Sequence, residues 1–136
     1  MADEGPAGGG RLRISSGGPW ERSVGYSRAI VAGDTCHVSG TTDAGPDGRS
    51  LNPGDAAAQA RAAWDIVERA LAEAGFRLDD VVRTRTYVVA IGDAPAVGAV
   101  HGERFGGIRP AATLVQVTGL IDPTLLVEIE AEARRD

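Results

Sequence analysis

The chain contains no lysine, since all 14 of its basic side chains are arginines. A lysine Schiff base and the lysine of a phosphate-binding P-loop are therefore excluded. Cys36 is the single cysteine, so no intrachain disulfide can form. The chain has only two histidines, His37 and His101. A zinc site usually needs three or four ligands, and no spacing of carboxylates completes one here, so we expect no metal site.

Charge and hydropathy exclude further classes of protein. The net charge of −5 lacks the basic footprint of a nucleic-acid-binding protein. No apolar run approaches the length of a membrane span, and the N-terminus lacks a signal-peptide core. We therefore expect a cytoplasmic protein with neither nucleic acid nor membrane as a partner. A chain of 136 residues can bury one core but not two. We predict a disordered tail over residues 1–10 and a single domain over residues 11–136.

Apolar periodicity predicts two helices, over residues 53–75 and 92–105, and five strands, over residues 26–32, 35–41, 80–90, 112–120 and 125–133. Asp55 and Asp93 are expected to cap the two helices. Arg61, Asp65, Arg69 and Glu73 recur every four residues and predict a charge ladder along the outer face of the first helix. Gly98 and Gly102 in the second helix indicate either close packing or a poor helix.

The predicted order, β-β-α-β-α-β-β, indicates an α+β fold in which two helices pack on one face of a mixed sheet. The other face of the sheet would be solvated or would meet another subunit. In the last strand, the residues from Leu125 to Ala133 alternate between apolar side chains and Glu128, Glu130 and Glu132. The three glutamates can be solvated, can pair with Arg83 and Arg85 across the sheet, or can include one cleft carboxylate that activates water.

Other candidates for chemistry are weaker. Cys36 and His37 are neighbours on a predicted strand, so they point to opposite faces and cannot form a local dyad. Ser39 has no nucleophile-elbow context. His101 shares a helix face with Val97 and Phe105, and it is either a histidine at the rim of the core or an acid or base in a pocket.

Taken together, several segments resemble the RidA/YjgF family of reactive-intermediate deaminases. They are "VSG" (38–40), "GDAAAQARAAWDIVERALAEAG" (54–75), "DVVRTRTYV" (80–88), "RPAATLVQV" (109–117) and "LVEIEAEA" (126–133). The resemblance implies a chorismate-mutase-like α+β fold and a homotrimer, with the sheets in a central barrel and clefts between subunits. It also implies hydrolysis of small enamines and imines to ketoacids and ammonia without a cofactor. In that chemistry an arginine binds the substrate carboxylate and a glutamate activates water.

Only some of the family's site residues have a match in this sequence. Tyr26, Ser39 and Glu128 match the pocket tyrosine, the serine and the catalytic glutamate. Ala112 stands where the resemblance expects the arginine. Leu114 stands where the deaminases often have cysteine, and Gly98 where they have a helix asparagine. Thr113, His101 and Arg109 complete the expected substrate-binding set. Arg109 lies three residues before Ala112, roughly 10 Å along an extended chain, and is either a charge at the cleft mouth or a substitute for the missing arginine.

These residues support three hypotheses. The first is a divergent Rid-type enzyme that acts by acid/base chemistry on a small imine, enamine or carbonyl compound without an arginine–carboxylate clamp. A cyclase or tautomerase would use the same groups. The second is a non-catalytic trimer that binds a small molecule or acts as a regulator. The third, a ribonuclease, is disfavoured by the acidic charge balance.

Overall fold

The computed structural model describes residues 2–4 and 10–136. These residues form one seven-stranded sheet in the order β1-β2-β3-β4-β7-β5-β6. Neighbouring strands are antiparallel except β5 and β6, which are parallel. The strands are β1 (Ala2–Glu4), β2 (Leu12–Ile14), β3 (Ala29–Ala32), β4 (Thr35–Thr41), β5 (Val81–Val88), β6 (Ala111–Gln116) and β7 (Val127–Arg134). The helices are α1 (Ala56–Glu73) and α2 (Ala94–Phe105), with short helical turns over Glu21–Gly25, Leu78–Asp80 and Ile91–Asp93.

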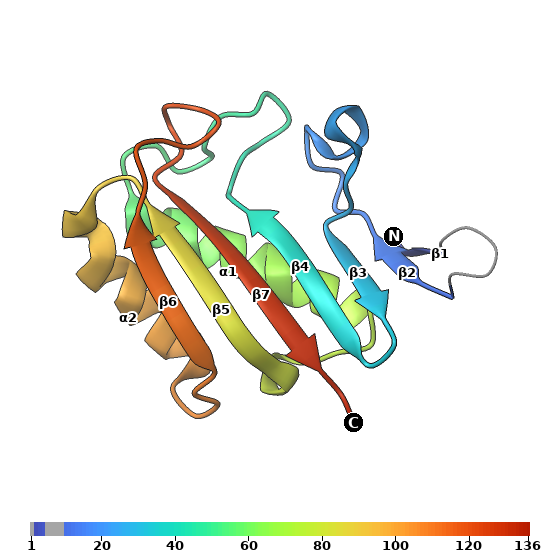
Figure 1. The fold of residues 1–136 in the computed structure, drawn as a ribbon. Coiled ribbons are helices and arrows are strands. Elements are labelled where there is room, and N and C mark those ends of the chain that lie inside the picture. Colours follow the sequence, from blue (N-terminus) through green and yellow to red (C-terminus); the bar gives the residue numbers. More distant parts are fainter. Residues whose placement is uncertain (1, 5–9) are drawn as a thin grey trace.

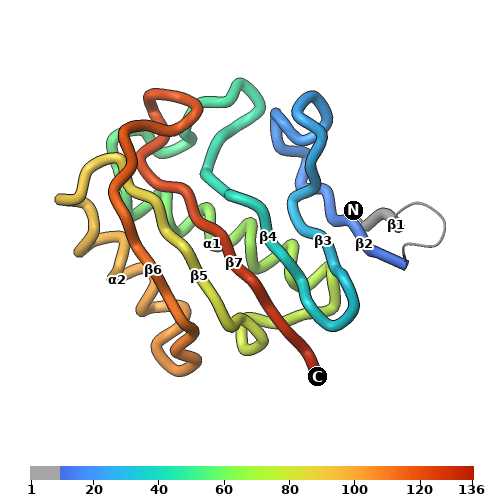
Figure 2. The backbone as a smooth tube through the Cα atoms, viewed as in Figure 1, coloured from blue at the N-terminus to red at the C-terminus, as the bar shows by residue number. Residues whose placement is uncertain are grey.

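Both long helices cover the same face of the sheet (Figures 1 and 2). Helix α1 packs against β4 and β7 at the centre of the sheet, and α2 packs against α1. The core between these layers contains Trp64, Leu71, Phe105 and Ile129. No helix of the described residues covers the opposite face (Figure 1). The predicted α+β arrangement, with two helices on one face of a mixed sheet, is therefore confirmed.

Helix α1 begins where the sequence predicts and for the predicted reason. The Asp55 carboxylate accepts a hydrogen bond from the backbone N–H of Ala58 at 3.0 Å, which satisfies one of the free donors of the first turn. The helix ends before Gly75, whose φ of +88° an L-residue adopts only at a cost. Two members of the predicted charge ladder bond to the neighbouring helix. Arg61 pairs with Glu103, and Asp65 with Arg104, both on α2.

Helix α2 forms, although the predicted cap at Asp93 is wrong and one of the two interpretations of its glycines is not supported. Asp93 makes no capping hydrogen bond with its side chain, because its backbone is already in the helical region. A Cβ built on Gly98 or Gly102 would meet no atom within 4 Å outside the local helix backbone, so these glycines are not there for close packing.

Strand β7 alternates as predicted. Its apolar side chains are buried against the helices, whereas Glu128, Glu130 and Glu132 lie half-buried on the open face. The pairing of these glutamates with arginines of β5 is confirmed for Arg85, whose Nη1 lies 3.5 Å from a carboxylate oxygen of Glu132.

The N-terminal region holds more structure than its sequence predicts. Most of the tail predicted over residues 1–10 lies outside the described residues, but Ala2–Glu4 form β1 and pair with β2. Strand β2 and the π-helix over Glu21–Gly25 were also not predicted. Three strand residues and five helical residues are too few to produce a periodic apolar pattern.

Candidate functional site

A β-bulge in β4 makes room for the side chain of Glu128. Val38 pairs with Ala131 and Thr41 pairs with Ile129, so the β4 strand contains one extra residue between these two pairs. The Glu128 carboxylate lies directly against the Cα of Gly40. A Cβ built on Gly40 would lie 1.9 Å from Oε2 of Glu128, which is far inside van der Waals contact. The absence of a side chain at Gly40 is therefore what allows the carboxylate to occupy this position.

Burial and a neighbouring carboxylate perturb Glu128. Burial raises the pKa of Glu128 above its ordinary value, and the charge of Glu130 raises it further, while Arg28 lowers it in part. Glu130 itself accepts a hydrogen bond at 2.8 Å from the Tyr87 hydroxyl, and this bond raises the pKa of Tyr87. A cleft carboxylate whose pKa is shifted toward neutrality is suited to accept a proton from water and to return it.

Arg28 lies beside the bulge, with a side chain only 7% exposed. Its Nη1 donates to the carbonyl oxygen of Gly40 at 2.6 Å and to Oγ1 of Thr41 at 2.9 Å. Its Nε donates to Oγ of Ser16 at 3.1 Å. Its Nη2 lies 3.5 Å from the hydroxyl of Tyr26, and the guanidinium carbon lies 5.5 Å from the centre of the Tyr26 ring. Arg28 thus ties the N-terminal loop to the bulge that holds Glu128.

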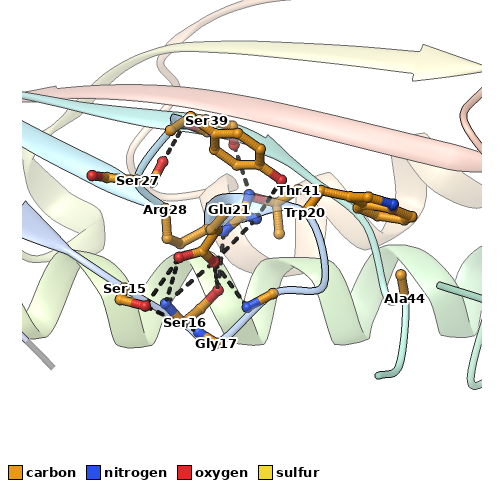
Figure 3. Close-up of polar contacts among 12 residues, drawn as sticks. Ser15, Ser16, Gly17, Trp20, Glu21, Ser27, Arg28, Ser39, Thr41 and Ala44 are labelled. Atoms are coloured by element: carbon orange, nitrogen blue, oxygen red, sulfur yellow. Dashed lines mark hydrogen bonds and ion pairs between the residues drawn. The ribbon is translucent and has the colours of Figure 1, made fainter. Parts of the chain in front are cut away.

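Glu21 neutralises this buried cation (Figure 3). Its Oε2 lies 3.5 Å from Nη2 of Arg28 and also accepts bonds from Oγ of Ser16 at 2.6 Å and from the N–H of Gly18 at 3.0 Å. Its Oε1 accepts a bond from Oγ of Ser15 at 3.1 Å. Burial alone would raise the pKa of Glu21, but these hydrogen bonds and Arg28 together lower it below its ordinary value. The carboxylate is therefore held in its ionised form.

Glu128 and Arg28 line an open cleft between the N-terminal loop and the loop that follows β4, and the cleft extends to the C-terminal half of α1. Tyr26 and Ser39 also line it, and the Ser39 hydroxyl donates to the carbonyl oxygen of Ser27 at 2.7 Å. The rest of the rim includes the apolar side chains of Trp20, Val24, Pro46, Leu51 and Ile121. Trp20 lies over the turn at Gly48, where a Cβ would be 3.1 Å from the indole ring. The cleft therefore combines the half-buried carboxylates of Glu128 and Glu130 and several hydroxyls with apolar side chains, and the exposed side chains of Arg22, Arg69 and Glu73 also line it.

The structure brings three of the residues predicted from the sequence to this cleft: Tyr26, Ser39 and Glu128. His101 is not among them. It bonds Oγ1 of Thr84 at 2.8 Å and packs against Trp64 and Phe105, with ring centroids at 5.8 and 4.7 Å. These contacts lie on the helix-covered face, opposite Glu128, and burial lowers the pKa of His101. Within one chain, His101 therefore lies at the core and does not share the cleft of Glu128.

The residues around the expected arginine position also lie apart from Glu128. Ala112 pairs with Thr84, so both share the helix-covered face of the sheet. Thr113 lies on the Glu128 face, but two strands away, and it accepts a bond from Nη2 of Arg83 at 2.9 Å. Arg109 has a φ of +58°, and its N–H donates to the carbonyl oxygen of Phe105, so its backbone terminates α2. Neither Ala112 nor Arg109 lines the cleft of its own chain.

Sequence reasoning missed Arg28 and Glu21. The only signals were a lone charged residue at the start of an apolar strand and a glutamate seven residues upstream, which match no recognised motif. The two meet because the π-helix and the loop at Ser15–Gly18 fold back onto β3. The described residues contain no cluster of three or more histidine, cysteine, aspartate or glutamate side chains suited to a metal ion. Within the same part of the chain, no helix is long and apolar enough to cross a membrane.

Comparison with known proteins places this chain in a family. The family model described as endoribonuclease L-PSP matches residues 20–135. An uncharacterized protein of Streptomyces coelicolor is 42% identical over 123 residues, covering 90% of this chain and 91% of that protein. A 2-iminobutanoate/2-iminopropanoate deaminase of Rattus norvegicus is 32% identical over 108 residues, covering 79% of this chain and 78% of the enzyme.

A solved structure supports the same assignment. A member of the YjgF/YER057c/UK114 family from Mycobacterium tuberculosis superposes with a TM-score of 0.83 at 49% sequence identity. The match covers 92% of this chain and 99% of that chain. Sequence and fold agree, and the chain therefore belongs to the RidA/YjgF family.

Proposed function

We propose that this protein hydrolyses a small reactive imine or enamine that carries no carboxylate next to the reacting carbon. The observation that carries the proposal is the carboxylate of Glu128, half-buried in a cleft, set against Gly40 and perturbed toward neutral pH. The activity for which the rat relative is named, deamination of 2-iminobutanoate and 2-iminopropanoate, supplies the reaction class. What differs here is the group that would recognise the substrate.

In the proposed reaction the Glu128 carboxylate accepts a proton from water as the water oxygen bonds to the imine carbon. The resulting carbinolamine receives a proton on nitrogen from the Glu128 carboxyl group. With the imine protonated at the outset, the nitrogen is now an ammonium group, and the C–N bond breaks as the hydroxyl oxygen becomes the carbonyl oxygen. The hydroxyl proton passes to the Glu128 carboxylate, and ammonia leaves with the carbonyl product. A raised pKa makes Glu128 effective in both steps, because the best acid–base catalyst has a pKa near the working pH. Tyr26 and Ser39 line the cleft in positions to hydrogen-bond the nitrogen or the oxygen.

Substrate choice follows from Ala112. The family resemblance places a carboxylate-binding arginine at this position, and a methyl group cannot make its bidentate, charge-assisted bonds. Leaving a buried substrate carboxylate without its partner costs about 3–5 kcal/mol. Arg28 offers little replacement, since its donors already contact protein atoms, and Arg22 and Arg69, which also line the cleft, are exposed to water. A neutral substrate with an apolar substituent is therefore the better match to this cleft and its rim.

We propose further that the active form is a homotrimer in which clefts lie between subunits. Two observations support this. The open face of the sheet carries half-buried polar side chains that no helix of residues 2–4 and 10–136 covers, and Ala112 lies on the opposite face from Glu128 within one chain. The position of the family arginine and Glu128 can therefore contribute to one site only if it is shared between chains. Light scattering on a size-exclusion column tests this; a monomer would contradict it.

The activity is tested with freshly generated imines in two parallel reactions. An amine oxidase supplies neutral imines, an amino-acid oxidase supplies 2-imino acids, and release of the carbonyl product is followed above the uncatalysed rate. We expect acceleration of the neutral imines, loss of that acceleration in Glu128→Gln, and no such loss in the matched control Glu132→Gln, which changes the same charge outside the cleft. The substitution Ala112→Arg should shift preference toward imino acids. No acceleration in either reaction, or full activity in Glu128→Gln, would refute the proposal.

A second function is favoured by one observation, the methyl group of Ala112. A trimer without the arginine can bind a small molecule without turning it over, as a regulator would. In that case the two imine reactions would stay at the uncatalysed rate. A small molecule bound in the cleft would shield the Glu128 carboxylate from solvent and so prevent it from exchanging its proton as the pH changes. The name of the family model also suggests a ribonuclease, but the net charge of −5 argues against binding a polyanion.

A further inference from the structure

Arg28 is the buried charged side chain of the cleft that the proposed reaction does not use. A guanidinium has five N–H donors in a rigid plane, and here each of its nitrogens has a partner. Three contacts are short, to Ser16, Gly40 and Thr41, at 2.6–3.1 Å. Two contacts of Nη2, to Tyr26 and Glu21, are long, at 3.5 Å. Arg28 is thus committed to protein atoms on both sides of the cleft wall, the N-terminal loop and the bulge.

We propose that Arg28, with Glu21, is a positioning residue for Glu128: it fixes the β-bulge whose Gly40 receives the Glu128 carboxylate. This rests on the catalytic role proposed for Glu128. The chain of contacts is direct. Nη1 of Arg28 donates to the Gly40 carbonyl oxygen, and the Cα of Gly40 lies against the Glu128 carboxylate. Because the bulge interrupts the pairing of β4 with β7, regular strand hydrogen bonds cannot fix this peptide by themselves.

The geometry requires an arginine. A lysine ammonium has three donors at one point, whereas the guanidinium spreads its donors over a planar fork. Ser16 lies at one edge of this fork, Gly40 and Thr41 at another, and Tyr26 and Glu21 at the third. No single point can reach all three edges. A lysine at position 28 therefore retains the charge but releases either the bulge or the N-terminal loop.

The charges around Glu128 give this role a measurable signature. Glu130 precedes the bulge partner Ala131 on β7, while Tyr87 and Arg85 face the same side from β5. Arg28 and Tyr26 approach from the β3 side of the cleft. Burial is the main cause that raises the pKa of Glu128, and Glu130 adds to it, whereas Arg28 opposes both. Removing Arg28 therefore raises the pKa of Glu128 further, which a purely structural arginine elsewhere would not do.

The experiment measures the Glu128 pKa directly, by NMR titration of the full chain labelled with 13C at the glutamate carboxyls. Wild type is compared with Glu21→Gln/Arg28→Met, which removes both buried charges together, and with Arg28→Lys. Arg104→Met is the matched control, because Arg104 is an arginine that bridges α1 and α2 away from the cleft. On the same samples, kcat and KM for imine hydrolysis are measured.

In Glu21→Gln/Arg28→Met we expect a Glu128 pKa above the wild-type value, and in Arg28→Lys an intermediate one. In both variants kcat should fall on the order of 100-fold, with a smaller change in KM, as for a displaced catalytic group. Arg104→Met should lower the free energy of unfolding without changing the Glu128 pKa or kcat. An unchanged Glu128 pKa in the double variant, or wild-type kcat in Arg28→Lys, would overturn the inference. If wild type hydrolyses no imine, the proposed function fails, while the titration still decides whether Arg28 positions Glu128.

Discussion

Replacing Gly40 with alanine separates the catalytic geometry of the cleft from the stability of the fold. The new Cβ would lie 1.9 Å from Oε2 of Glu128 and 3.0 Å from its Cδ. Ordinary contact begins at 3.4 Å, so the carboxylate must retreat by about 1.5 Å. The atom that clashes is the far end of a flexible side chain, and Gly40 is not among the glycines with positive φ. The variant can therefore fold by turning Glu128 away.

The expected magnitudes follow from these contacts. Glycine to alanine at a compatible backbone position stabilises a protein by about 0.4–1 kcal/mol. Pushing the Glu128 side chain off its preferred rotamer costs about 0.5–1.5 kcal/mol. The two effects nearly cancel, so the free energy of unfolding of Gly40→Ala should stay within about 1 kcal/mol of wild type. Displacing the catalytic carboxylate by more than about 1 Å should lower kcat on the order of 100-fold.

Gly33→Ala is the matched control, because it should lower stability while leaving the Glu128 carboxylate in place. A Cβ at Gly33 meets no atom within 4 Å, but its φ of +62° is strained for an L-residue, at a cost of roughly 1–2 kcal/mol. Urea denaturation and imine hydrolysis should thus show a stable, inactive Gly40→Ala and a less stable, active Gly33→Ala. A folded Gly40→Ala that hydrolyses imines at the wild-type rate would refute the assignment of Glu128.

Three further predictions concern titration and packing. Because the folded-state pKa of Glu128 is raised, its favourable contribution to stability is complete below the ordinary value of 4.5 and is lost as the pH rises through the folded-state pKa. Urea denaturation should therefore find Glu128→Gln more stable than wild type at pH 7, with the gain vanishing below that value; a constant gain would contradict this. Burial raises the pKa of Cys36 to about 11, so its thiol should not react with a disulfide reagent at pH 8 until the protein unfolds. Trp64→Ala should lower the free energy of unfolding by about 3–5 kcal/mol in denaturant titrations, because Trp64 is buried at the centre of the core against Phe105; a loss below about 1 kcal/mol would show that the core is not built around it.

The regular elements could be predicted from the sequence because their signals are local. Asp55 and Gly75 mark the ends of α1 by hydrogen-bonding capacity and by backbone freedom. The alternation through Leu125–Ala133 assigns one face of β7 to the core, and it thereby places Glu128 on the open face from sequence alone. Strand β2 and the π-helix escaped prediction because both are too short to show a periodic pattern and are held by contacts with the segment around β3, through strand pairing and through Arg28. The sequence left His101 open between two interpretations, since only its neighbours Thr84 and Trp64 decide which side of the sheet it faces.

By itself, the sequence determined the α+β order, the two helices on one face and the position of Glu128, because side-chain periodicity and caps act over a few residues. Only the tertiary structure decided what surrounds that glutamate. Arg28, Glu21 and Gly40 are spread over 20 residues of the chain and share no spacing rule, and they converge because the N-terminal loop folds back onto β3 and β4. The pKa of Glu128 depends on burial and on charges from several strands, which are properties of the assembled cleft rather than of any segment.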